Sequence, residues 1–331
     1  MYGLMVRILI ALVVLLACGA WMLLRWTRMP GRSFTGEAPA ATDELRELAA
    51  ELRADLLVLA GEIGERNVAH PEAYARAADW IAERLGETGL EVRREAYEAR
   101  GRTFENLWVE IDGASSRELV VVGAHYDTAT GSPGANDNGT GVVATLALAR
   151  RFAAAEAPPR RLRFVLFANE EPPFFWTEGM GSREHVRRLA AAREEVTAML
   201  SLETLGCYDD ERGSQRYPFG VGWLYPDRGN FVAFVSDVRS RDLCRRSVGL
   251  FRERATIPSE GGALPRYLPG VGWSDHHSFW RAGYPALMVT DTAPFRDPRY
   301  HTQDDRVEHV DFLRLARVVE GVQYVVERLA R

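Results

Sequence analysis

The chain has 331 residues, of which 47% are hydrophobic and 26% charged, a composition typical of a globular protein with a substantial core. Its formal net charge of -5 supplies no basic field for a phosphate backbone, so we expect no nucleic-acid partner. Every basic residue is an arginine, which excludes mechanisms based on a lysine nucleophile or Schiff base. Any catalysis must therefore use other groups.

Residues 1–29 form a separate apolar segment. Its stretch Ile8 to Leu24 carries no charge and is followed by Arg25 and Arg28, which predicts a single membrane-spanning helix. We favour a retained transmembrane anchor over two alternatives. A cleaved signal peptide is disfavoured because the apolar run continues past its small residues, and a lipoprotein would be modified at Cys18 within an atypical lipobox.

Residues 30–41 are rich in Pro, Gly and Ala and have no helical period, which predicts a linker. Residues 42–331 then predict a single catalytic domain. The remaining cysteines, Cys207 and Cys244, are too few for a zinc-thiolate site. We expect each to be a small buried apolar residue, with a disulfide between them as the alternative in an oxidising compartment.

Helical and strand patterns alternate through this domain. The apolar spacing predicts helices over residues 42–64, 71–86, 140–155, 182–192 and 310–329. Strands are predicted over residues 90–96, 103–111, 119–124, 162–168, 198–203 and 285–290. The run Leu119 to Ala124 is apolar throughout, as expected of a strand buried on both faces. The pattern predicts an α/β fold with a mixed, mostly parallel central sheet and helices on both faces.

Five short motifs place acids and histidines just after predicted strands or in loops near them. They are GAHYD at 123–127, GANDNGTG at 134–141, FANEE at 167–171, SLETLG at 201–206 and YHTQDD at 300–305. Because ligands of open α/β sheets bind outside the carboxyl ends of the strands, these motifs are expected to meet at one edge. Their imidazoles and carboxylates are the ligands that two neighbouring zinc ions require. The sequence thus predicts a metal-dependent hydrolase.

In this order, the motifs resemble those of metallopeptidase family 28, the two-zinc aminopeptidases of clan MH, over residues 67–331. The resemblance implies a zinc-exopeptidase, phosphorylase/hydrolase-like fold, a peptide substrate and cleavage of N-terminal residues. It also implies two Zn²⁺ ions, although carboxylate-rich sites accept other divalent metals. The metal ligands implied by the resemblance are His125, Asp137, Glu171, Glu203 and His301.

Within this ligand set, the resemblance assigns Asp137 as the bridge between the metals and Glu170 as the general base for a metal-bridging water. Neighbouring side chains on an extended segment point in opposite directions, so Glu171 can bind metal while Glu170 faces the water. The peptide bond from Asp137 to Asn138 is expected to be cis, as it often is in the family. Many members have Asp where this chain has Glu203, and a small backbone shift is expected to absorb the extra methylene.

Further residues are expected to support the site. Tyr300 resembles the phenol that stabilises the developing oxyanion in some members. Asp127 is expected to accept the second imidazole N–H of the first motif and so to fix its tautomer. Asp275 and His276 lie in a segment that the family uses to support the metals.

Three other parts of the chain have expected positions. The segment at about 206–272 has no chemistry that the sequence assigns, and we expect it to form an insert on the substrate side. The aromatic residues 174–176 follow the glutamate pair, and we favour a pocket wall for them over a core position. His185 is expected on an exposed helix face.

Several functional alternatives stay open. A carboxypeptidase of the same fold would need an arginine clamp for the terminal carboxylate. A glutaminyl cyclase would keep one zinc and lose the first histidine ligand, and an inactive ectodomain would only bind. The arginines after the apolar run outnumber Arg7 before it, which favours a cytoplasmic domain. The resemblance instead favours a periplasmic or extracellular one. The sequence predicts no oligomeric state.

Overall fold

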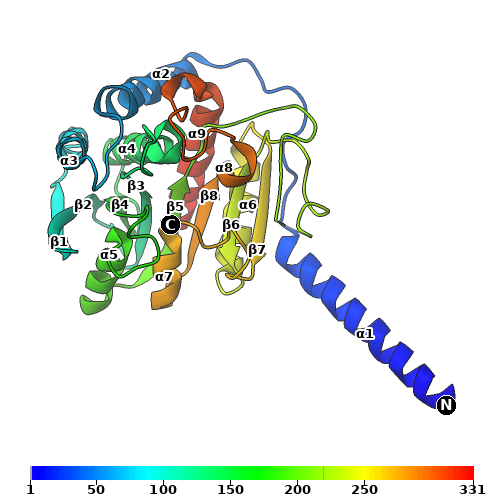
Figure 1. Ribbon diagram of the computed structural model, residues 1–331. Helices are drawn as coiled ribbons and strands as arrows, with labels where there is room; N and C mark the ends of the chain where they lie inside the picture. Colours follow the sequence, from blue (N-terminus) through cyan, green and yellow to red (C-terminus); the bar gives the residue numbers. More distant parts are fainter. Residues whose placement is uncertain (1, 219) are drawn as a thin grey trace.

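A computed structural model describes residues 2–218 and 220–331. Helix α1 (Tyr2–Thr27) projects away from the rest of the molecule (Figure 1). Its segment Leu4–Thr27 has a mean hydropathy of 2.5 and is not buried against the domain. By length and composition it can cross a membrane, and its place near the N-terminus is also that of a signal sequence.

The chain that leaves α1 lies against helix α6 (Arg241–Arg254). The guanidinium of Arg241 donates to the carbonyl of Arg25 at 2.7 Å, and that of Arg252 donates to the carbonyl of Pro30 at 3.1 Å. The first part of the predicted linker is therefore held on the domain by hydrogen bonds.

The domain is built on an eight-stranded sheet in the order β1-β2-β4-β3-β5-β8-β6-β7. Strands β4, β3, β5 and β8 run parallel at its centre. Strands β1 and β2 are antiparallel at one edge, and the parallel pair β6–β7 joins β8 in the antiparallel sense. The strands are β1 (Arg93–Ala99), β2 (Arg102–Ile111), β3 (Leu119–His125), β4 (Arg161–Phe167), β5 (Val196–Glu203), β6 (Val232–Asp237), β7 (Ser259–Leu264) and β8 (Ala286–Thr290).

Helices cover both faces of this sheet (Figure 1). One face carries α2 (Asp43–Leu56), α3 (Pro71–Gly86), α4 (Thr140–Ala153), α6 and α9 (Phe312–Leu329). The other face carries α5 (Gly181–Ala191) and α7 (His276–Ala282). The short elements are η1 (Leu57–Ile63), η2 (Ala135–Gly139), α8 (Ala293–Arg296) and η3 (Val307–His309). The prediction of a mixed, mostly parallel sheet between helices is confirmed.

Strand β3 shows why the sequences of the central strands are continuous apolar runs. Val120 and Val122 point into the core beneath α4, whereas Leu119 and Val121 point into the core beneath α5 and α7. All four side chains are fully buried. Because both faces are covered, neither set of alternating positions has to be polar.

The structure corrects one expectation from the sequence and adds detail to two others. His185 is completely buried, so its predicted exposure is wrong: the imidazole lies 3.1 Å from the Glu95 carboxylate and packs edge-on against Phe167. Cys207 and Cys244 are both free and buried, so they form no disulfide. The segment 206–272 contains β6, α6 and β7 and thus contributes two strands to the sheet itself.

Candidate metal centre and adjoining cavity

The ends of three neighbouring parallel strands bring the predicted ligands together. Strand β3 ends at His125 and β5 ends at Glu203, while β4 lies on the other side of β3 and leads into Glu170 and Glu171. Because the strands are parallel, their carboxyl ends share one edge of the sheet. The turn η2 supplies Asp137 to the same place.

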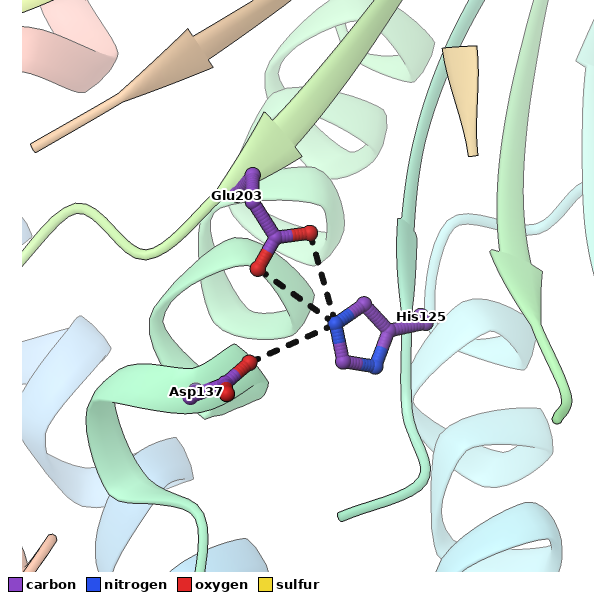
Figure 2. Close-up of side chains that lie close together, drawn as sticks. All are labelled: His125, Asp137 and Glu203. Atoms are coloured by element: carbon purple, nitrogen blue, oxygen red, sulfur yellow. Dashed lines mark hydrogen bonds and ion pairs between the residues drawn. The ribbon is translucent and has the colours of Figure 1, made fainter. Parts of the chain in front are cut away.

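The first group of possible ligands consists of His125, Asp137 and Glu203, whose nitrogen and oxygen atoms lie within 4.8 Å of one another (Figure 2). The Nε2 atom of His125 is 3.4 Å from Asp137 Oδ1 and 3.3 Å from Glu203 Oε2. All three side chains are buried. Their ligand atoms therefore converge on one small volume that water reaches poorly.

A second group consists of Asp137, Glu171 and His301 and meets the same 4.8 Å criterion. The Nε2 atom of His301 is 2.9 Å from Asp137 Oδ2 and 3.1 Å from Glu171 Oε1. One oxygen of Asp137 thus faces each group. Glu170 lies beside them, with its Oε2 atom 3.9 Å from His125 Nε2.

The oxygen atoms of this site fit divalent cations. Asp137 Oδ2 and Glu171 Oε1 are buried and make no hydrogen bond of acceptable geometry, even though His301 Nε2 lies close to both. Buried carboxylates without such partners are costly unless a cation compensates them. Imidazole nitrogen and carboxylate oxygen are the donors that zinc prefers in catalytic sites.

The carboxylates also shift the protonation of their neighbours. Burial raises the pKa of Glu170 well above its usual value, His125 opposes this shift, and the charges of Glu171 and Glu203 add to it. Burial alone would lower the pKa of His301, but Asp137 and Glu171 raise it to about 10. The two carboxylates thus favour the protonated form of this imidazole.

Asp305 fastens the loop that carries Asp137. Its two carboxylate oxygens accept the backbone N–H groups of Asn136 at 2.7 Å and of Asp137 at 3.0 Å. The peptide bond from Asp137 to Asn138 is cis, as expected. Gly134, at φ +63°, begins the turn, and a Cβ atom there would lie 2.6 Å from the Asp137 carbonyl oxygen. Sequence reasoning missed Asp305, although it is the second acid of the YHTQDD motif.

Asp127 positions three of the predicted site residues at once. Its Oδ1 and Oδ2 atoms accept the backbone N–H groups of Glu170 and Glu171, both at 3.0 Å. The Nδ1 atom of His125 is 3.2 Å from the Asp127 carbonyl oxygen and 3.4 Å from Oδ1. This residue therefore orients both the histidine and the glutamate pair, a wider contact than the sequence suggested.

The segment after β7 supports Glu203 through a residue that the sequence did not single out. The hydroxyl of Ser274 donates to Glu203 Oε2 at 2.7 Å. Its neighbour Asp275 is fully buried, and burial raises the pKa of that carboxyl to about 7. His276 instead bonds to the carbonyl of Val271 at 2.9 Å and packs against Trp280. Among the described residues no hydrogen bond joins His276 to the ligand set, so its expected supporting contact is absent.

A cavity with about 890 Å³ of empty space, including its open mouth, adjoins the ligand groups. Glu203 and Tyr300 line it at the metal side, where the Tyr300 ring stacks on that of His301 with centroids 3.9 Å apart. The segment 206–272 supplies much of the remaining wall. Residues 174–176, expected in a pocket wall, are not among the residues that line this cavity: Phe174 packs in the core against Phe104, whereas Trp176 is exposed.

An α/β sheet whose parallel strand ends carry two imidazole–carboxylate groups around one shared aspartate defines a metal-dependent hydrolase. The chain belongs to peptidase family M28, whose family model matches residues 106–326. It is therefore an enzyme of the peptidase class.

Curated relatives share much of its length. The uncharacterized protein YfbL of Escherichia coli is 34% identical over 75% of this chain and 78% of its own length. A probable leucine aminopeptidase of Trichophyton verrucosum is 28% identical over 74% of this chain, which spans only 64% of that protein.

Solved structures with low sequence identity share the fold. BSAP, a zinc aminopeptidase from Bacillus subtilis, has a TM-score of 0.66 at 16% identity, over 85% of this chain and 94% of that one. A glutaminyl cyclase of Bacteroides thetaiotaomicron has a TM-score of 0.64 at 17% identity, over 90% and 99% respectively. At this level of identity, both similarities show the fold and do not identify the reaction.

Proposed function

We propose that the protein is a two-zinc aminopeptidase that removes N-terminal residues from peptides. The single observation that carries this proposal is the shared carboxylate: one oxygen of Asp137 faces His125 and the other faces His301. A carboxylate that bridges in this way keeps two cations close together. The probable leucine aminopeptidase among the relatives and the zinc aminopeptidase among the structural neighbours support the same function.

In this proposal the five ligand residues form two sets that share Asp137. His125 and Glu203 would hold one zinc, Glu171 and His301 would hold the other, and Asp137 would contact both. The extra methylene of Glu203, compared with the Asp of many relatives, is accommodated because its carboxylate reaches within 3.3 Å of His125 Nε2.

The reaction then follows from the residues around the ligands. Two zinc ions, when bound, lower the pKa of a water molecule and polarise the scissile carbonyl. Glu170 accepts the proton of the attacking water and passes it to the departing amine nitrogen. Burial raises the pKa of Glu170, which makes its carboxylate a stronger base for that proton. Tyr300, whose pKa burial raises, stays protonated and donates a hydrogen bond to the oxyanion.

The alternatives fit less well. The described residues that line the cavity include no arginine to clamp a terminal carboxylate, as a carboxypeptidase requires. A one-zinc cyclase would not need the complete first group with His125. An inactive binding protein would have no reason to retain Glu170 beside two complete ligand groups.

A panel of peptides with free and blocked ends tests this function. The protein supplied with zinc should hydrolyse peptides with a free N-terminus, release their first residue, and fail on the N-acetylated forms. Amidation of the C-terminus should leave turnover unchanged. Cleavage of the acetylated peptides from their C-terminus would instead identify a carboxypeptidase, and cyclisation of N-terminal glutamine without hydrolysis would identify a cyclase.

We also place residues 42–331 as one catalytic domain, held to the membrane by α1 and facing the periplasm or the exterior. The apolar, unburied surface of α1 supports the anchor, although the arginines that follow it favour the opposite side by charge alone. Protease added to intact cells should release the domain. Complete protection, with digestion only after permeabilisation, would place the domain in the cytoplasm.

A further inference from the structure

A straight row of residues crosses the sheet from the metal centre to its edge. Glu203 on β5 pairs with Thr290 on β8, which pairs with Ala233 on β6, which in turn pairs with Glu260 on β7. Side chains of directly paired residues point to the same face of a sheet. All four residues line the cavity, so this row forms part of its floor.

The row sets the distance between the two carboxylates. Neighbouring strands lie about 4.8 Å apart, so three strand spacings separate the backbones of Glu203 and Glu260 by roughly 14 Å. Side chains that rise from the two ends leave a shorter gap between them. A substrate residue held at the metals by its backbone can therefore extend a long side chain along the floor toward Glu260.

The walls between the two ends are mostly apolar. Met288 and Val235 pair with each other in the neighbouring row, two residues from Thr290 and Ala233, and also line the cavity. Tyr217 and Tyr225 stack at the far end with centroids 5.9 Å apart. Gly262 lies two residues beyond Glu260 on the same strand face, where a Cβ atom would come within 2.7 Å of the Tyr225 hydroxyl. The missing side chain leaves room for Tyr225 at the far end of the cavity.

Among the described residues, Glu203 and Glu260 are the only charged side chains that line this cavity. The Glu260 side chain is 24% exposed, and its carboxylate makes no hydrogen bond to the other described residues. Its nearest cationic group, the Arg252 guanidinium, lies 3.9 Å away and already donates to the Ser259 carbonyl at 2.6 Å. Burial raises the pKa of Glu260, as expected of a carboxylate whose charge is poorly compensated.

We infer that Glu260 selects a cationic side chain, so that the preferred substrates are peptides whose N-terminal residue is arginine or lysine. The inference rests on the proposed aminopeptidase function. The long methylene stem of such a residue would lie against the apolar walls, and its charged end would reach Glu260. Leucine would fill only the near part of the cavity and leave the half-buried Glu260 carboxylate with the Arg252 guanidinium, 3.9 Å away, as its nearest cationic group. A guanidinium can form two parallel hydrogen bonds with that carboxylate, so arginine should be preferred to lysine.

Matched pairs of substrates test this inference on the full-length, zinc-loaded protein in detergent. The value of kcat/KM is measured for peptides that differ only in their first residue: arginine against its neutral isostere citrulline, lysine against norleucine, and leucine as reference. Wild-type protein should favour each cationic residue over its neutral partner by about 10-fold to 100-fold. Equilibrium binding of free arginine and citrulline, measured by calorimetry, should show the same order without any turnover.

The variant Glu260→Gln should remove that preference while leaving the leucine substrate unaffected, and leucine turnover also reports that the variant is folded. Glu47→Gln, which removes an exposed carboxylate on α2, is the matched control and should behave as wild type. Equal rates for arginine and citrulline in the wild-type protein, or an unchanged preference in Glu260→Gln, would overturn the inference. Failure to hydrolyse any free N-terminal peptide would instead defeat the proposed function.

Discussion

The two ends of the cavity hold their carboxylates in different ways. Glu203 receives a hydrogen bond from Ser274 at 2.7 Å and faces His125, within a cluster whose loops are fastened by further carboxylates. Glu260 lies on the edge strand β7, with one guanidinium 3.9 Å away. Groups that react must be held in a fixed position by neighbouring hydrogen bonds. A group that only selects the substrate does not need such contacts before the substrate binds. Changes at the metal end should thus abolish the rate, and changes at the far end should alter which substrate is used.

The largest effect is expected from Asp137→Asn, which removes the shared carboxylate from both metal groups. Activity should fall to background, and zinc should no longer raise the melting temperature, because ligands stabilise only the folded state that binds them. Thermal denaturation with zinc and with chelator measures this directly. The wild-type protein should lose stability on chelation. Equal melting temperatures of the wild type in the two conditions would show that the buried carboxylates do not bind metal.

Glu170→Gln should lower kcat by about 10²-fold to 10⁴-fold, the usual contribution of a general base, while metal content stays at the wild-type level. The amide has nearly the same shape as the carboxylate but cannot take up the proton. Steady-state kinetics together with elemental analysis separate the two roles. A variant that keeps its turnover would show that another group accepts the proton.

Tyr300→Phe should lower kcat by about 10²-fold with little change in KM, because the hydroxyl is proposed to bond only to the developing oxyanion. The ring would still stack on His301, so metal binding should persist. An increase in KM at constant kcat would indicate instead that the hydroxyl binds the ground-state substrate.

The smallest effect on turnover is expected from Asp305→Asn, which weakens the two hydrogen bonds that fasten the Asp137 loop. Zinc affinity should fall by about 10-fold to 100-fold, and saturating zinc should restore most of the activity. The adjacent Asp304 is exposed, so Asp304→Asn is the matched control and should titrate as wild type. Lost activity that zinc cannot restore would point to a distorted loop.

The metal end could be predicted from sequence because its residues lie in short motifs at strand ends, where topology brings them together. The supporting contacts could not. Asp305 bonds to backbone groups of a loop far away in the chain, and Ser274 is one of many serines. The prediction for His185 failed because its helix packs on β2 and β4, and Glu95 compensates the buried imidazole.

The role of Glu260 at the far end of the cavity was harder to predict from the sequence, for a related reason. Strand β7, SEGGAL, has two adjacent glycines and no regular alternation, so neither strand propensity nor period marks it. Glu260 reaches the cavity because of its register with Ala233 and Thr290. Register between strands of distant segments is not encoded locally. Only the assembled sheet places it on the floor of the cavity.

Elemental analysis of the purified full-length protein tests the central claim most directly. Active protein at saturating zinc, after removal of unbound metal, should contain close to two zinc ions per chain, and Asp137→Asn should contain close to none. Full activity with a single zinc ion per chain would contradict a site in which Asp137 holds two metals.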